Sequence, residues 1–149
     1  PMASGAGRVF EAAGAMLGVG VENRWEGEAA ARLEALAAPE SDSVEPWTEI
    51  SLDTGGPVPV LPSARLLTEV ARRAASGEPP SLIAAGFHAT FCSLAASLTA
   101  LVAGPDRGTV AIGGGCVINR LLSSGLADQL EKRGFEVLLP SRMPPGDGG

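Results

Sequence analysis

A glycine turn between an apolar segment and an asparagine is the strongest sign of chemistry in this sequence. Residues 110–119 read Val-Ala-Ile-Gly-Gly-Gly-Cys-Val-Ile-Asn. Glycine permits positive φ angles and close approach of the backbone to a ligand, and a helix that begins after such a turn has N–H groups without intrahelical partners. These N–H groups suit a phosphate or the polar edge of a ring. The pattern predicts a nucleotide site at Gly114, Gly115 and Asn119, with an ordinary strand–turn–helix connection as the alternative.

A second glycine turn closes the sequence and carries one carboxylate. Residues 144–149 read Pro-Pro-Gly-Asp-Gly-Gly, which places Asp147 between glycines. A carboxylate oxygen is a suitable ligand for a hard divalent cation that bridges phosphate oxygens. A single carboxylate cannot hold such an ion alone, and the chain contains only one histidine. Asp147 and Gly148 therefore either contribute to a metal and phosphate site completed by other residues, or form a tight turn.

Three further motifs accompany these turns. They are Gly7-Arg8-Val9-Phe10-Glu11-Ala12, Glu26-Gly27-Glu28-Ala29-Ala30 and Phe87-His88. In this order, the five segments resemble the second, C-terminal lobe of the Kae-like carbamoyltransferase domain of HypF proteins, the maturation factors of nickel–iron hydrogenases. They also resemble O-carbamoyltransferases such as TobZ. The resemblance covers about residues 4–149, and Pro1 before Met2 is expected to be a remnant of cloning.

The resemblance implies an α/β fold, one lobe of the actin-like (ASKHA) ATPase fold, with a mixed sheet flanked by helices and residues 1–149 forming a single lobe. It implies ATP as the nucleotide and, in a complete site with two lobes, a divalent metal, Mg or Fe. The residues implied to bind the nucleotide are Gly114, Gly115, Asn119, Glu11, Gly27 and Gly148, with Asp147 at the metal. We expect both glycine turns to lie on one rim, because successive parallel strands end on the same side of a sheet.

The chain departs from the family pattern at the first turn. Gly113 stands where a serine is usual, and Val117-Ile118 stand where Phe-Gln is usual. Replacement of the Gln by Ile118 removes a potential hydrogen bond but leaves the backbone geometry available. Glu11 stands where the family has an aspartate near the ribose, and an exposed helix acid is the alternative interpretation. Gly27 aligns with a glycine beside the adenine, and its alternative role is entry into a helix.

Periodicity and glycine or proline boundaries predict the elements that position these residues. Helices are predicted at 7–17, at 28–37 with a Glu28–Arg32 pair, and at 63–75 with Ser63 as N-cap. A buried helix after Pro80 has the apolar stripe Ile83, Phe87, Phe91, Leu94, Leu98 and Leu101, and a crossover helix carries Ile118, Leu122, Leu126 and Leu130 with an Asp128–Lys132 pair. Short strands are predicted at 47–52, 58–61, 109–112 and 135–139, the third of them covered on both faces.

Composition excludes several classes of function. The chain has 11 Lys and Arg against 17 Asp and Glu, a formal net charge of -6, and its basic residues are scattered. This disfavours nucleic-acid binding. We expect no signal peptide, no membrane span, and a cytoplasmic protein. Cys92 and Cys116 lie in apolar segments without paired spacing, which indicates reduced thiols in the core.

The remaining candidates are more simply explained by structure. His88 follows Phe87 at the edge of the apolar stripe, without a nucleophile motif beside it, and is expected to be a structural histidine. Trp25 and Trp47 are expected to cover the core rather than to stack on a base. No catalytic residue can be named from the sequence.

Two hypotheses for function remain. The first is the nucleotide-binding lobe of a HypF-like carbamoyltransferase, which takes a carbamoyl adenylate made from carbamoyl phosphate and ATP and passes the carbamoyl group to an acceptor such as a HypE-like protein. That function needs a first lobe. The second is a non-catalytic nucleotide-binding or scaffolding partner that docks on a first-lobe polypeptide or forms a homodimer. A tRNA-modifying enzyme of the TsaD type is disfavoured by the net charge and by the motifs at Glu26-Gly27 and Phe87-His88.

Overall fold

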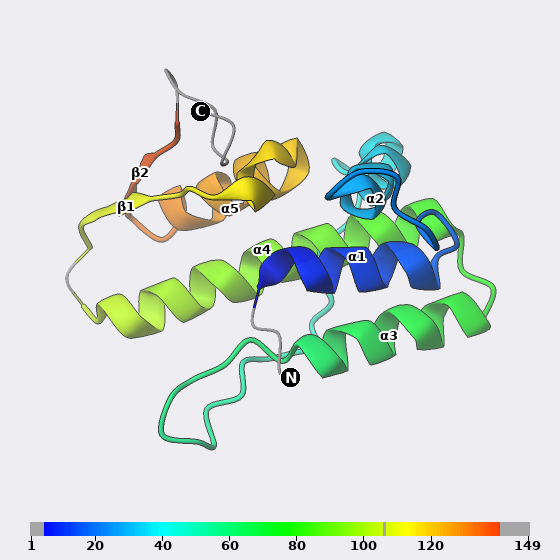
Figure 1. Ribbon diagram of the computed structural model, residues 1–149. Helices are drawn as coiled ribbons and strands as arrows, with labels where there is room; N and C mark the ends of the chain where they lie inside the picture. The colour runs from blue at the N-terminus through cyan, green and yellow to red at the C-terminus, as the bar shows by residue number, and fades with distance from the viewer. Residues whose placement is uncertain (1–4, 106, 141–149) are drawn as a thin grey trace.

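The computed structural model describes residues 5–105 and 107–140, in which helices dominate and a small parallel sheet lies at one end (Figure 1). The helices are α1 (Ala6–Met16), α2 (Glu28–Ala37), α3 (Ser63–Ala75), α4 (Pro80–Ala103) and α5 (Arg120–Glu131), with short 3₁₀ helices η1 (Ala38–Glu40) and η2 (Gly115–Ile118). The strands are β1 (Thr109–Ala111) and β2 (Glu136–Leu138). The predicted α/β class and all five predicted helices are confirmed.

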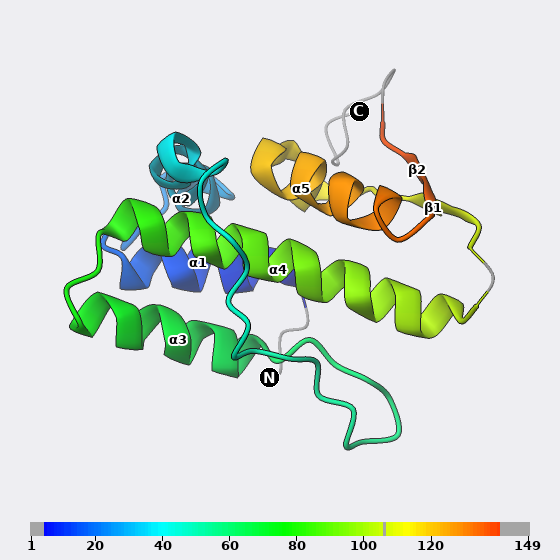
Figure 2. The ribbon, with the colours of Figure 1, turned by 180° about the vertical axis from the view of Figure 1, so that it is seen from behind.

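Helix α4 forms the centre of the molecule. It contacts α2, α3 and α5 along its length, and α1 and α3 run beside it (Figures 1 and 2). The predicted stripe is buried from Ile83 to Leu94, but Leu101 is 52% exposed because the last turns of α4 extend beyond the other helices. No membrane span was expected from the sequence. Pro80–Ala103 has the length and mean hydropathy, 1.5, of one, yet 61% of that window is buried inside the protein, as in a core helix.

Close helix contact depends on two glycines. On α1, a Cβ at Gly14 would lie 2.9 Å from the carbonyl oxygen of Ala29 on α2. On α4, a Cβ at Gly86 would overlap the indole of Trp47. Trp47 is buried, as predicted, and its backbone N–H donates to Oγ1 of Thr90 over 2.8 Å. The first contact brings α1 against α2, and the others pack the loop that carries Trp47 onto α4.

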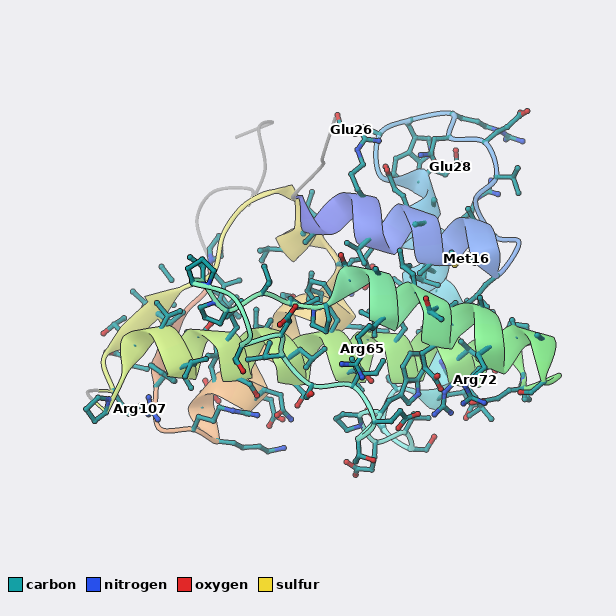
Figure 3. The ribbon with its side chains drawn as sticks, turned by 90° about the horizontal axis from the view of Figure 1, so that it is seen from below. Met16, Glu26, Glu28, Arg65, Arg72 and Arg107 are labelled. Atoms are coloured by element: carbon teal, nitrogen blue, oxygen red, sulfur yellow. The ribbon has the colours of Figure 1, made fainter. Side chains whose placement is uncertain are left out.

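An ionic cluster secures α3 beside this core. The Glu69 carboxylate accepts hydrogen bonds from Arg72, at 2.6 and 2.8 Å, and from Nε of Arg73, at 2.6 Å. Figure 3 shows Arg72 projecting from α3 toward the loop that precedes this helix. The guanidinium of Arg73 also lies 4.6 Å from the centre of the Trp47 ring, which joins the cluster to the buried tryptophan. The hydrogen bonds from Arg72 hold the pKa of Glu69 at about 2, although burial opposes that shift.

The strands predicted at 47–52 and 58–61 are wrong. Between η1 and α3, a range that is fully described, one isolated antiparallel bridge joins Asp53 to Val60. Prolines at 57, 59 and 62 lack the N–H groups that a ladder needs. The apolar residues that suggested a strand, such as Ile50, are buried from a loop. Ser63 is also the first helical residue rather than the N-cap, a position held by Pro62.

The sheet is smaller than predicted. Strands β1 and β2 pair in parallel, with Val110 opposite Val137, and α5 connects them. Val110 and Val137 pack on a second apolar cluster with Phe135 and Leu130, but Thr109 and Ala111 are exposed. The prediction that β1 is covered on both faces is therefore wrong within the described chain. The predicted mixed sheet is likewise reduced, in the described residues, to this parallel pair.

Candidate nucleotide site

A cavity of about 160 Å³ lies where α1, the loop before α2, η2 and the start of α5 meet. Its walls are mainly apolar. The residues that line it are Gly7, Phe10, Trp25, Glu26, Gly27, Ala30, Ala31, Glu34, Gly115, Cys116, Ile118, Asn119 and Leu122. Figure 3 shows Glu26 and Glu28 in the region where the loop enters α2, beside α1. An apolar cavity with a few polar groups is typical of a small-molecule site.

The structure brings together three of the residues predicted to bind a nucleotide. Gly27, Gly115 and Asn119, which are far apart in the sequence, line the cavity, and Gly114 directly precedes Gly115. Glu11 does not line it.

Glu11 instead makes contacts within the N-terminal region. Its carboxylate accepts from Arg8 at 3.0 Å and from Asn23 at 3.5 Å. Asp147 and Gly148 lie outside the described residues, so their predicted place on the same rim remains a prediction.

The glycine turn has one position that requires glycine. Gly114 has φ +94° and ψ 168°, a conformation that is strained for any residue with a side chain. Gly113 and Gly115 do not have positive φ, and a Cβ at either would meet no protein atom within 4 Å. The conformation of Gly114 therefore shapes the turn, while Gly115 lines the cavity and leaves room for a side-chain atom.

Asn119 is a buried N-cap with a second partner. Its Oδ1 accepts from the N–H of Leu122 at 2.9 Å, which fixes the orientation of the amide. The amide nitrogen therefore points toward Nε2 of His88, 3.1 Å away. Asn119 is only 7% exposed, so this helix cap is buried. One N–H of its amide is used by His88, which leaves the other N–H for a ligand.

His88 is held as a neutral imidazole. Its Nδ1 lies 2.8 Å from the carbonyl oxygen of Ala84, which can only accept, so Nδ1 carries the proton and Nε2 accepts from Asn119. Burial lowers the pKa of His88, because the charged form loses its hydration. Edge-on contact with Phe10, with ring centres 5.2 Å apart, completes its surroundings. The expectation of a structural histidine is confirmed, but the contact with Asn119 was not foreseen.

The first N–H groups of α5 already have partners. The N–H of Arg120 donates to Oε1 of Glu34 at 2.7 Å, and that of Leu122 donates to Asn119. The expectation that these groups are free for a phosphate is therefore wrong for these two. A carboxylate at a helix N-terminus is favoured by the helix dipole and competes with any other anion there.

A buried carboxylate positions the loop before α2. Glu28 is 4% exposed, and its Oε2 accepts from the backbone N–H of Arg24 at 2.5 Å. The predicted Glu28–Arg32 pair is confirmed at 2.6 Å. The hydrogen bond from Arg24 is the main cause that lowers the pKa of Glu28. Gly27, with φ +83°, makes the sharp entry into α2 that the sequence suggested as its alternative role.

Two large apolar side chains at the cavity are exposed. Trp25 is 56% exposed, so the expectation that it covers the core is wrong. Ile118 is 65% exposed, because it lies in η2 and not on the apolar face of α5, where the sequence had placed it.

The predicted Asp128–Lys132 pair on α5 is confirmed at 2.7 Å.

The two cysteines differ in environment. Cys92 is buried, and burial raises the pKa of its thiol to about 12. Cys116 is partly buried and lines the cavity, so only Cys92 is a core thiol of the kind predicted.

The described residues offer binding groups rather than a complete catalytic set. They contain no group of three or more His, Cys, Asp or Glu side chains that could hold a metal. A divalent metal therefore does not fit the described part of the chain without ligands from elsewhere. The neutral His88 uses both ring nitrogens in protein contacts, so this histidine is not available as a base.

Comparisons with known proteins identify the family of this chain. A family model described as "Carbamoyltransferase, Kae1-like Domain, second subdomain" matches residues 1–149. The chain is 36% identical to a carbamoyltransferase HypF homolog of Cupriavidus necator. The matched region covers 100% of this chain and 39% of that protein. It is 38% identical to carbamoyltransferase HypF of Rhizobium leguminosarum, of which it covers 19%.

A solved structure is similar as well. The crystal structure of full-length HypF in a phosphate- and nucleotide-bound form matches with a TM-score of 0.87 and 32% identity, over 97% of this chain and 19% of that one. The chain thus spans well under half the length of these relatives. It belongs to the HypF carbamoyltransferase family, in which it corresponds to the second subdomain of the Kae1-like domain.

Proposed function

We propose that this subdomain supplies one wall of an ATP site in a HypF-like carbamoyltransferase. The single observation that carries the proposal is the cavity at which Gly27, Gly115 and Asn119 meet. The solved relative that shares this fold is described as nucleotide-bound, which favours a nucleotide over other small molecules. The base would occupy the apolar cavity, and the sugar and phosphates would pass over the open backbone at Gly115.

The reaction requires residues beyond this subdomain. We propose that a first subdomain closes the cavity and, with Asp147, holds a divalent metal, Mg or Fe, that would neutralise phosphate charge. Carbamoyl adenylate, made from carbamoyl phosphate, ATP and water with release of phosphate and pyrophosphate, would then transfer its carbamoyl group to an acceptor such as a HypE-like protein during hydrogenase maturation, with AMP as the leaving group. The described residues would orient the nucleoside through the amide of Asn119 and the apolar walls of the cavity.

A second candidate function is a nucleotide-binding scaffold without catalysis. The open face of β1, with Thr109 and Ala111 exposed, favours docking on another polypeptide or a second copy. Both functions use the same cavity. They differ in whether the assembled protein turns over carbamoyl phosphate.

Protection of Cys116 from alkylation tests the site directly. The thiol lines the cavity, whereas Cys92 is buried with a raised pKa and serves as the internal control. Adenosine or ATP should slow modification of Cys116 by N-ethylmaleimide, measured by peptide mass spectrometry. Unchanged modification of Cys116 at ligand concentrations that saturate binding would place the nucleotide elsewhere, and no binding at millimolar ligand would refute the proposed function.

A further inference from the structure

An exposed indole at the mouth of a cavity needs an explanation beyond folding. Trp25 is 56% exposed although a tryptophan gains much stability from burial. The other tryptophan, Trp47, is 6% exposed and packs on Gly86 in the core. Trp25 lines the same cavity as Asn119. Its exposed face is therefore available to whatever occupies that cavity.

The backbone that carries Trp25 is held on both sides. The preceding residue, Arg24, donates its N–H to Glu28, and the carbonyl oxygen of Trp25 accepts from the N–H of Glu28 at 3.3 Å. Oδ1 of Asn23 accepts from the N–H of Ala29 at 3.0 Å. These contacts fix the loop to the start of α2. A side chain on a fixed backbone loses less entropy when it contacts a ligand, which favours a preformed binding surface.

A second exposed apolar side chain faces the same cavity from another segment. Ile118, in η2, is 65% exposed and lines the cavity with Trp25. Neither residue belongs to the two buried apolar clusters of the described chain. Exposed apolar groups that gather at a concave site indicate a ligand with apolar faces.

The size and polar groups of the cavity indicate a flat ring with a polar edge. Its volume of about 160 Å³ is below the roughly 300–1,000 Å³ of sites that enclose a drug-sized molecule. It suits a base rather than a whole nucleotide. The amide of Asn119 provides a donor, and the carboxylates of Glu26 and Glu34 provide acceptors. A purine base presents both acceptors and an amino group along its ring edge.

We propose that Trp25 is a specificity-determining residue that stacks its indole on the purine base, with Ile118 as a second apolar contact. This inference rests on the proposed function and adds which side chain distinguishes a ligand with a base from one without it. Stacking of a base on an aromatic side chain is sequence-tolerant but requires a π face, so a sugar phosphate alone would gain nothing from it.

Adenosine titrations of this chain and three variants test the proposal by calorimetry. Trp25→Ala should weaken adenosine binding by about fivefold to a hundredfold, whereas Trp25→Phe, which keeps a π face, should retain most of the affinity. Val21→Ala is the matched control, because Val21 is 80% exposed in the same loop but does not line the cavity. It should bind like the parent chain. Circular dichroism should show all variants folded.

Tryptophan fluorescence provides a second measurement, because adenosine would not change the emission of Trp25 if this residue had only a structural role. Adenosine should change the tryptophan emission of the parent chain, and this change should disappear in Trp25→Phe, where Trp47 alone reports. Ribose 5-phosphate, which lacks the ring, should neither bind comparably nor change the emission.

The results distinguish a failure of the stacking proposal from a failure of the proposed nucleotide site. Equal adenosine affinity in the parent chain and Trp25→Ala would overturn stacking while leaving the nucleotide site in place. Ribose 5-phosphate binding as tightly as adenosine would also overturn it. Absence of adenosine binding by the parent chain would overturn the proposed function together with this inference.

Discussion

The amide nitrogen of Asn119 lies 3.1 Å from Nε2 of His88, and each side chain is fixed on its other side by a backbone group. Leu122 donates to the Asn119 amide oxygen, and Ala84 accepts from Nδ1 of His88. This chain of hydrogen bonds joins α4 to the start of α5 at the wall of the cavity. Asn119 is thus both a helix cap and a positioned donor.

The Asn119–His88 contact predicts a change of protonation in Asn119→Asp. An aspartate still caps α5 but cannot donate to Nε2, and its negative charge favours a proton there. The pKa of His88, which burial lowers in the parent protein, should therefore rise. Titration of the imidazole by NMR would measure it, with Ser124→Asp, on the exposed side of α5, as a control for added charge. An unchanged pKa of His88 in Asn119→Asp would contradict the assigned hydrogen bond.

Removal of the Asn119 side chain should cost stability as well as binding. Asn119→Ala loses the cap of α5, worth about 0.5–2 kcal/mol, and leaves Nε2 of His88 without its donor. Nucleotide binding should weaken by about 1–3 kcal/mol. Urea unfolding and calorimetry would measure the two losses. A variant as stable as the parent would show that the cap contributes nothing.

Glycines in the turn should separate folding from binding. Gly114→Ala should destabilise the protein by about 1–3 kcal/mol, because its φ of +94° is strained for alanine. Gly115→Ala should leave stability nearly unchanged, since a Cβ there meets no protein atom within 4 Å, yet weaken nucleotide binding by occupying the open space. Gly113→Ala, which has equal room but does not line the cavity, is the control. Parent-like affinity in Gly115→Ala would argue against close approach of a ligand.

The Glu69 cluster predicts an acid-sensitive contribution to stability. The pKa of Glu69 is about 2 in the folded protein, against 4.5 as its ordinary value. Its stabilisation should therefore be fully present above about pH 4.5 and be lost as the pH falls toward 2. Urea unfolding of Glu69→Gln should show a loss of stability near pH 7 that shrinks over this range. Glu22→Gln, which removes an exposed carboxylate, is the control, and a pH-independent difference for Glu69→Gln would refute the ionic origin.

Sequence patterns predicted the helices because apolar periodicity and glycine boundaries act locally. They failed at Trp25, because the residues next to it in the sequence do not indicate whether its side chain is buried or exposed. They also failed at Ile118, whose spacing fits α5 although the cap at Asn119 starts that helix later. Trp47 to Leu52 resembled a strand because buried loops and strands share apolar residues. In each of these three cases the outcome depends on contacts between residues that are distant in the sequence.

For the site, the sequence indicated Gly27, Gly115 and Asn119 but could not show that one cavity joins them. The partners of Asn119 were also beyond local patterns, because His88 is distant in the sequence. A signal did exist: a buried histidine needs a partner for each ring nitrogen, and an asparagine cap has an N–H to spare. Glu34 was not predicted at all, since nothing local connects it to the N–H of Arg120.

This chain alone should lack carbamoyltransferase activity and bind ATP only weakly. A cavity of about 160 Å³ buries little of a whole nucleotide. The described residues also contain no group of three or more His, Cys, Asp or Glu side chains that could hold a metal ion. A pyrophosphate-release assay with carbamoyl phosphate and ATP would measure turnover. Turnover by the pure chain would refute the need for a first subdomain.

The position of a bound nucleoside tests the central claim most directly. Amide resonances of the isotope-labelled chain should be followed while adenosine is added. The largest shifts should fall at Gly27, Gly115, Asn119 and the indole N–H of Trp25, with little change at Asp53 or Glu69, which lie away from the cavity. Shifts that spare these cavity residues and gather on another surface would contradict a nucleoside site between α1, α2 and η2.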